Sequence, residues 1–158
     1  MKYMAFVVVS TLLAQPLPAS AQGVSGEDPL LGTWHLNVSK STYNPGPAPK
    51  SQTRIYKKHR FGIEGTVKTV EADGRTMTVQ SVFDYDKQEH PVTGAEDIDT
   101  IVMTRINTHT SVATFSHAGM EIGTFERVVS RDGKQMTVTL KRSTPQTSNV
   151  EIYQKEEQ

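Results

Sequence analysis

The sequence predicts an all-β protein, an antiparallel up-and-down β-barrel of eight to ten strands. Apolar and polar residues alternate in short segments along most of the chain, which is typical of strands with one buried face. Turn signals built on Asp, Asn, Gly and Pro separate these segments, and no convincing helical period occurs after residue 21. Adjacent strands joined by short turns favour a closed barrel over an open immunoglobulin-like sandwich, because closure leaves no exposed sheet edge.

A signal peptide is predicted over residues 1–21. Lys2 supplies a positive start, residues 5–14 are mostly apolar, and the small residues 19–21 form a cleavage pattern. The apolar run is roughly half as long as a membrane span requires, so we expect cleavage rather than anchoring. The protein is therefore expected to be exported, to the periplasm or outside the cell.

The mature chain is expected to hold a short disordered tail, residues 22–29, and one domain, residues 30–155. The formal net charge of the chain is zero and its pI is near 7.0, which removes an electrostatic case for nucleic acid or an anionic membrane. The chain has no cysteine, so disulfides, thiolate metal sites and a lipid-modified cysteine are excluded. No later segment is long and apolar enough to span a membrane.

The first strand is predicted at residues 30–38 and carries Trp34, the only tryptophan of the chain. Period two places Gly32 and Trp34 on the same face. A glycine lets a neighbouring backbone come close and an indole fills space, so this strand suits the floor of a small barrel. Residues 39–50 contain three prolines and a glycine, which exclude a helix and a central strand. We expect a loop there, a strap across one end of the barrel rather than a lid.

Alternation and turn signals locate the other strands. Hairpin turns are expected at residues 72–75 and 131–134, where Asp and Gly are adjacent. Residues 90–92 are too short and too proline-bound for a central strand. Residues 93–99 are acidic and are expected to form a solvated loop. The remaining strands are expected at residues 52–59, 63–71, 76–85, 100–106, 110–116, 120–130, 135–142 and 149–154.

Three stretches carry a family resemblance. Residues 32–36, Gly-Thr-Trp-His-Leu, resemble the Gly-x-Trp strand of the lipocalins and the Gly-Thr-Trp-x-Leu opening of the intracellular fatty-acid-binding proteins. Residues 127–139 and 152–155 resemble the last hairpin and the closing strand of the same calycin group. Over residues 30–155 the chain is similar to small exported bacterial lipocalin-like proteins. This resemblance implies a lipocalin-like barrel with room for a small ligand inside.

The resemblance also implies a structural cluster at the barrel floor. Lipocalin-type barrels often pack an arginine over the tryptophan of the first strand, and Arg127 is the candidate here. Gly32, Trp34 and Arg127 are therefore expected to close the barrel.

Two departures from the fatty-acid-binding proteins matter. The helix pair that follows their first strand is replaced by the proline-rich residues 39–50. Their closing strand clamps a carboxylate with Arg-x-Tyr, whereas this chain has Glu151, Ile152 and Tyr153. A buried glutamate would repel a fatty-acid carboxylate, so the usual clamp cannot be carried over. Binding of an apolar or neutral ligand remains open.

No catalytic or metal-binding pattern occurs in the sequence. The five histidines are scattered without ligand spacing, and the acids of residues 96–99 lack the spacing of a calcium loop. Gly-x-Ser-x-Gly, His-Glu-x-x-His and a phosphate-binding glycine loop are absent, so we expect no enzyme, no metal and no cofactor. The basic cluster of Lys57, Lys58 and Arg60 is expected to be a solvated strand end rather than a nucleic-acid site.

The leading hypothesis is an exported, monomeric barrel that binds a small apolar or amphipathic molecule, such as a lipid, without a covalent bond. Burial of apolar ligand surface, worth about 25 cal/mol per Å², would drive binding. The alternative is a barrel with a filled core that serves as a surface or protein-interaction module, and a hydrolase or isomerase comes third. The expected cavity lining is the apolar members of the alternating strands: Leu36, Ile55, Val67, Met77, Val79, Phe83, Ile101, Met103, Phe115, Ile122, Val138 and Tyr153.

Overall fold

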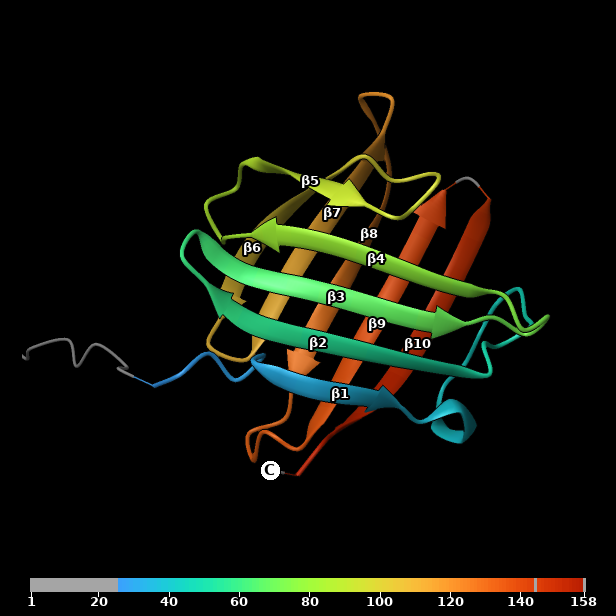
Figure 1. Ribbon diagram of the computed structural model, residues 1–158, viewed down its shortest axis with the longest axis horizontal. Helices are drawn as coiled ribbons and strands as arrows, with labels where there is room; N and C mark the ends of the chain where they lie inside the picture. Colours follow the sequence, from blue (N-terminus) through green and yellow to red (C-terminus); the bar gives the residue numbers. More distant parts are fainter. Residues whose placement is uncertain (1–25, 144, 158) are drawn as a thin grey trace, which may run out of the picture.

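The computed structural model describes residues 26–143 and 145–157, which form a closed barrel of ten antiparallel strands (Figure 1). The predicted signal peptide, residues 1–21, and the first part of the predicted tail, residues 22–25, lie outside the described residues. The strands are β1 Gly32–Leu36, β2 Ser51–His59, β3 Gly62–Val70, β4 Thr76–Phe83, β5 Glu89–Thr93, β6 Thr100–Asn107, β7 Thr110–His117, β8 Met120–Val129, β9 Gln135–Ser143 and β10 Gln146–Lys155.

Each strand pairs with its neighbours in the sequence, and β1 pairs with β10 to close the barrel. The closing register places Trp34 opposite Lys155 and Leu36 opposite Tyr153. Each short turn makes the next strand antiparallel to the last, and the twist that accumulates over the sheet brings its two ends together. The predicted all-β, up-and-down barrel of eight to ten strands is confirmed.

β5 corrects one prediction. Residues 90–92, expected to be too proline-bound for a central strand, belong to β5, which lies between β4 and β6. β5 pairs with β4 at only two positions and with β6 at three. Pro91 has no amide hydrogen to donate, and a short strand with few pairs tolerates this loss without opening the barrel.

An irregular strap connects β1 to β2. It begins with the 3₁₀ turn η1, Val38–Lys40, whose Lys40 amide donates to the Asn37 side chain at 3.2 Å. Farther along, Thr42 and Val150 of β10 exchange two backbone hydrogen bonds of 2.8 and 2.9 Å. These bonds fix the strap to the barrel wall. Among the described residues, no helix has the length and apolar character needed to cross a membrane.

The end of the barrel nearest the start of β1 is filled. Trp34 is completely buried, and its Nε1 donates a 2.8 Å hydrogen bond to the Leu30 carbonyl. Lys155 covers the indole, with its Nζ 5.1 Å from the ring centroid. Gly32 makes room for this lysine, because a Cβ at that position would lie 2.6 Å from Lys155 Cε. Other members of the same buried cluster are Met103, Val129, Met136, Val138 and Tyr153.

Contacts with the barrel begin before β1. Asp28 accepts hydrogen bonds from the Leu30 amide at 3.0 Å and the Tyr85 hydroxyl at 3.2 Å, and it pairs with Arg105. The Arg105 guanidinium carbon also lies 4.1 Å from the centroid of the Tyr85 ring. Residues 26–29, expected to belong to a disordered tail, are instead held on the barrel because Asp28 makes these contacts.

Candidate functional site

The inward side chains do not fill the barrel completely. In the half of the barrel where β3 turns into β4 and β5 leads into β6, they leave a cavity of about 250 Å³. Val67 and Val79, from β3 and β4, form part of one wall, and Leu140 of β9 forms part of another. The interior therefore has space for a small guest, which a completely filled core would not have.

Six of the twelve predicted lining residues line this cavity: Val67, Met77, Val79, Phe83, Ile101 and Phe115. Four others pack in or against the buried core instead: Leu36, Met103, Val138 and Tyr153. Ile55 contributes to a hollow outside the barrel, because neighbours in a strand alternate and the adjacent Arg54 faces the cavity. Ile122 is half-buried and does not line the cavity.

A charged network crosses the interior between β2 and β10. Arg54 Nη2 lies 3.0 Å from Glu151 Oε2, and these side chains are only 13% and 6% exposed. Arg54 Nε donates to the Tyr153 hydroxyl at 2.8 Å, and this hydroxyl donates to Glu151 at 2.6 Å. Burial opposes the charge on Arg54, but Tyr153, Tyr56 and Glu151 raise the pKa of its guanidinium well above the ordinary value. The charge of Glu151 is therefore compensated within the protein.

Arg127 of β8 lies in the cavity wall with 2% of its surface exposed, and no ion pair to it occurs among the described residues. Its guanidinium carbon lies 5.0, 5.2 and 5.1 Å from the ring centroids of Tyr56, Phe83 and Phe125. Nη2 lies 3.5 Å from Met103 Sδ, while Nε is buried without a hydrogen-bond partner. The three aromatic faces stabilise the cation, but they do not supply a counter-ion.

The predicted stacking of Arg127 on Trp34 is wrong. The aromatic rings within about 5 Å of the Arg127 guanidinium carbon are those of Tyr56, Phe83 and Phe125, and the cation over the Trp34 ring is Lys155. Trp34 pairs with Lys155 on β10 and with Arg54 on β2, and the Lys155 ammonium group lies over the indole ring. Arg127 instead faces the cavity, among rings contributed by β2, β4 and β8.

The pKa of the Tyr56 phenol indicates which sign of charge this part of the interior favours. The residue is only 4% exposed, and burial by itself would raise the pKa of the phenol. The guanidinium groups of Arg127 and Arg54 nevertheless lower this pKa below its ordinary value of 10.0. The potential around Tyr56 therefore favours a negative charge.

At the mouth of the cavity, Arg142 of β9 pairs with Asp97 from the loop between β5 and β6. Arg142 Nη2 lies 2.6 Å from Asp97 Oδ2, and the two side chains are 16% and 54% exposed. The guanidinium carbon lies 5.6 Å from the Phe115 ring centroid, and Nε is buried without a hydrogen-bond partner. Asp97, expected to belong to a solvated acidic loop, therefore contacts a residue of the cavity wall.

The family resemblance placed Glu151 and Arg127 inside the barrel, but sequence reasoning missed the rest of the polar lining, because it assigned polar strand residues to the face in water. The cross-strand register gives the signal that was needed. Arg54 lies opposite Trp34, so the two side chains share the inner face, as do Gln52 and Tyr56 by period two. The polar lining residues are Gln52, Arg54, Tyr56, Thr69, Gln80, Ser81, Arg127, Arg142 and Glu151.

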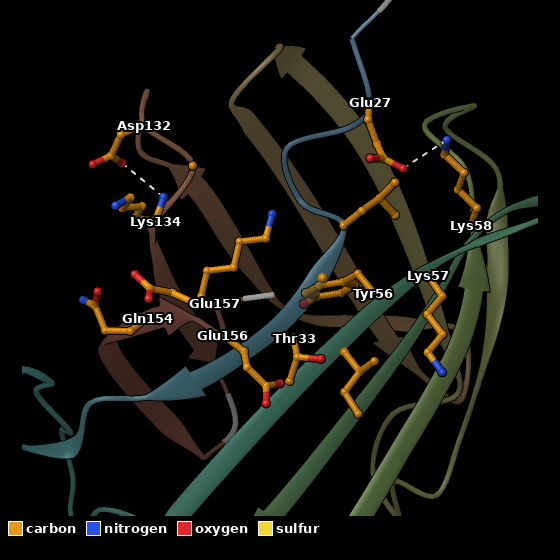
Figure 2. Close-up of a pocket in the computed structure, with 15 residues that line it drawn as sticks. Glu27, Thr33, Tyr56, Lys57, Lys58, Asp132, Lys134, Gln154, Glu156 and Glu157 are labelled. Atoms are coloured by element: carbon orange, nitrogen blue, oxygen red, sulfur yellow. Dashed lines mark hydrogen bonds and ion pairs between the residues drawn. The ribbon is translucent and has the colours of Figure 1, made fainter.

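A second, larger hollow of about 1060 Å³ lies outside the barrel beside β1 (Figure 2). Its lining carries four lysines and four acidic residues, and Figure 2 shows one ion pair among them, between Lys58 and Glu27. Lys58 Nζ lies 3.1 Å from Glu27, and the Lys134 amide donates to Asp132 at 3.1 Å. This hollow therefore offers no preference for a ligand of either charge. The described residues also contain no group of three His, Asp or Glu side chains placed to hold a metal ion.

No family model matches the sequence, and no curated protein matches it. Among solved structures, the chain is similar to the wild-type fluorescent protein UnaG, with a TM-score of 0.52 and 19% identity over 80% of this chain and 97% of that chain. An alanine-substituted variant of UnaG gives a TM-score of 0.53 and 14% identity over 82% and 98% of the two chains. A redesigned β-barrel, mFAP1, bound to DFHBI gives a TM-score of 0.42 and 14% identity over 80% and 95%.

The likeness to UnaG concerns the fold, because the identities are low. It shows a shared closed, antiparallel β-barrel fold, whereas membership of the calycin group, which the opening Gly-Thr-Trp segment indicates, stays a prediction. The exported and bacterial character suggested by the resemblance stays a prediction.

Proposed function

We propose that the protein binds one small amphipathic molecule without a covalent bond inside the barrel, and that the acidic group of this molecule lies against Arg127. The observation that carries the proposal is a guanidinium group that is 2% exposed, borders a cavity and has an unpartnered Nε. Burial of a charge without a counter-ion is costly. An anionic group in the cavity would offset this cost and gain charge-assisted hydrogen bonds.

The apolar wall supports the other half of the proposed ligand. The cavity that Arg127 borders is also lined by the apolar residues Val67, Val79, Ile101 and Phe115. A bound molecule would therefore contact the guanidinium group and the apolar wall at the same time. Each Å² of apolar ligand surface removed from water contributes about 25 cal/mol. An amphipathic acid, such as a lipid-like molecule, matches this combination better than a purely apolar one.

The sequence suggests that Glu151 would repel an acidic ligand, but the contacts of Glu151 in the structure argue against this. Its carboxylate is paired with Arg54 at 3.0 Å and accepts a hydrogen bond from Tyr153 at 2.6 Å. A ligand would therefore meet a neutralised pair at this point of the wall, and the positive charge of Arg127 remains to attract an anion. This is why we favour an acidic ligand over the neutral one that the sequence leaves open.

We further propose that the protein is an exported, monomeric binding protein rather than an enzyme. Export is supported by the sequence of residues 1–21, with its positive start, apolar run and small-residue cleavage pattern. A binding role is supported by the barrel itself, because a closed barrel of this size encloses room for one small ligand.

The test uses two fluorescent probes that share their aromatic rings. 8-Anilinonaphthalene-1-sulfonate carries an acid group, and N-phenyl-1-naphthylamine lacks it. We expect the mature protein to bind both probes, and Arg127→Met to weaken the sulfonate probe by about tenfold to a hundredfold, because a charged hydrogen bond is lost. The neutral probe should change by less than about threefold.

Arg131→Met is the matched control, since Arg131 is an exposed arginine only four residues away in the sequence. This variant should bind both probes like the wild type. Equal binding of the sulfonate probe by wild type and Arg127→Met would contradict the role of Arg127. Failure of the wild type to bind either probe would favour the alternative of an interaction module that takes no small-molecule ligand.

A further inference from the structure

The loop between β5 and β6, residues 94–99, is fixed at both ends. Gly94 has a φ of +82°, and a Cβ there would lie 1.9 Å from the Thr78 carbonyl oxygen of β4. At the other end, the Asp99 amide donates to the Ser116 carbonyl at 2.8 Å, and the Ala118 amide donates to the Asp99 carboxylate at 2.7 Å. The residues between these two anchors are therefore the part of the loop that can move away from the barrel.

One of these residues lines the cavity, and its neighbour pairs with another lining residue. Ile98 lines it directly, and Asp97 forms the 2.6 Å ion pair with Arg142, which also lines it. The ion pair ties the middle of the loop to β9, on the far side of the mouth from β5. A closed ion pair therefore keeps Ile98 over the cavity.

The two partners of this ion pair differ in what they would lose if it broke. Asp97 is 54% exposed, so its carboxylate would return to water at little cost. Arg142 is 16% exposed, its Nε is buried without a partner, and its guanidinium lies over Phe115. Arg142 thus needs an anion more than Asp97 needs a cation, and another anion that reaches Arg142 can replace Asp97.

We infer that Asp97 and Arg142 form a latch that selects acidic ligands: the acidic group of an incoming molecule displaces Asp97 from Arg142, which frees the middle of the loop and opens the cavity. This inference rests on the proposed binding of an acidic amphipathic ligand inside the barrel. A neutral molecule of the same shape has no means to displace Asp97 and waits for the ion pair to open by itself. The latch acts on the rate of uptake, whereas Arg127 acts on the final affinity.

The cavity volume agrees with such a mechanism. About 250 Å³ is slightly below the range of roughly 300–1,000 Å³ that is typical of sites for drug-sized ligands. Movement of Ile98 with the loop would enlarge this space and admit a longer ligand.

The test is a stopped-flow measurement of association rates on the mature protein, with the sulfonate probe and its neutral analogue. Asp97→Asn removes the charge of the latch while it keeps the size of the side chain. We expect this variant to speed uptake of the neutral probe about fivefold, since an ion pair of this exposure holds the loop only weakly. The preference of the wild type for rapid uptake of the acidic probe should shrink accordingly.

Two further variants keep the result interpretable. Glu96→Gln removes a neighbouring exposed charge from the same loop and should leave both rates unchanged. Arg142→Met should speed the neutral probe like Asp97→Asn and slow the acidic probe, because the anion then lacks its first partner.

The latch would be overturned if the wild type binds both probes at equilibrium but Asp97→Asn leaves the neutral rate unchanged. An equal effect of Glu96→Gln and Asp97→Asn would also overturn it, since general charge would then explain the rates. Absence of any probe binding by the wild type would remove the proposed function, and the latch with it. Equilibrium affinities measured on the same samples separate these failures.

Discussion

The two ends of this barrel are built by the same alternating strands but enclose opposite interiors. At the closed end, Leu30, Val129 and Met136 are buried among apolar neighbours. At the mouth end, the inward positions carry Arg54, Arg127 and Glu151 around a cavity of about 250 Å³. Dense apolar packing stabilises a fold, whereas a buried charge without a counter-ion destabilises it. The difference indicates that the closed end stabilises the barrel. The buried charges at the mouth end lower the stability of the fold but provide a binding site.

The largest expected effect is at the closed end. Trp34→Ala should lower the free energy of unfolding by about 3–5 kcal/mol, because it leaves a large cavity and removes the hydrogen bond to the Leu30 carbonyl. Urea unfolding followed by circular dichroism measures this loss. Trp34 does not itself line the cavity, although its cross-strand partner Arg54 does, so the folded fraction should bind the sulfonate probe within about threefold of wild type if Arg54 keeps its pairing with Glu151. A much larger loss of affinity would show that the two ends are not separate.

The next effect concerns the ion pair at the mouth end. Glu151→Gln should lower the free energy of unfolding by about 3 kcal/mol, because it leaves Arg54 buried without a counter-ion. The same variant should bind the sulfonate probe more tightly, since the interior gains net positive charge. The control is Glu126→Gln on β8, which is exposed and should change neither property. Reduced stability together with weaker sulfonate binding would contradict this account of the interior.

A smaller effect of opposite sign is expected at Arg127. Arg127→Met should raise the free energy of unfolding of the empty protein by about 1 kcal/mol, because a buried charge is replaced by an apolar chain of similar length. Stability should thus rise in the variant that loses affinity for the acidic probe. Thermal unfolding of both proteins without ligand measures this gain in stability. A marked loss of stability would mean that the aromatic faces alone satisfy the cation.

The smallest effect is a pH dependence at the closed end. Burial raises the pKa of Tyr85 to about 12, and the nearby Asp28 adds to the rise. Between pH 10 and about 12 the folded protein keeps a proton that the unfolded chain has lost, so this group makes stability fall as pH increases.

Tyr85→Phe tests this pH dependence. The plot of unfolding free energy against pH should become less steep between pH 10 and about 12, while stability at pH 7 falls by less than about 1.5 kcal/mol. The comparison of wild type and variant removes the contributions of other tyrosines, including the opposite one of Tyr56, whose pKa is lowered. Identical slopes for both proteins would contradict the role of Tyr85.

Much of the fold could be predicted because the signals are local. The turn at Gly74 and the alternation of β4 lie within a few residues of each other, so neighbouring positions determine them. β5 escaped prediction because it contains Pro91 and pairs at few positions, so the closed sheet around it makes it a strand.

The apolar lining was partly predictable, and the charged lining was not. Val67 and Val79 follow from alternation, because an apolar residue on the inner face is the ordinary case. Arg54 and Glu151 stand 97 residues apart, and although the resemblance placed Glu151 inside, no local signal indicated that Arg54 is its partner. Only the barrel register shows that they meet, and only the three-dimensional structure shows that Arg127 faces a cavity rather than Trp34.

The most direct test of an acidic ligand in the barrel is native mass spectrometry of the mature protein, purified from its source under non-denaturing conditions, beside Arg127→Met prepared in the same way. We predict that the wild type carries one bound molecule per chain, that this molecule ionises as an anion after release, and that the variant lacks it. A bare wild-type mass, combined with no uptake of the sulfonate probe, would contradict the proposal.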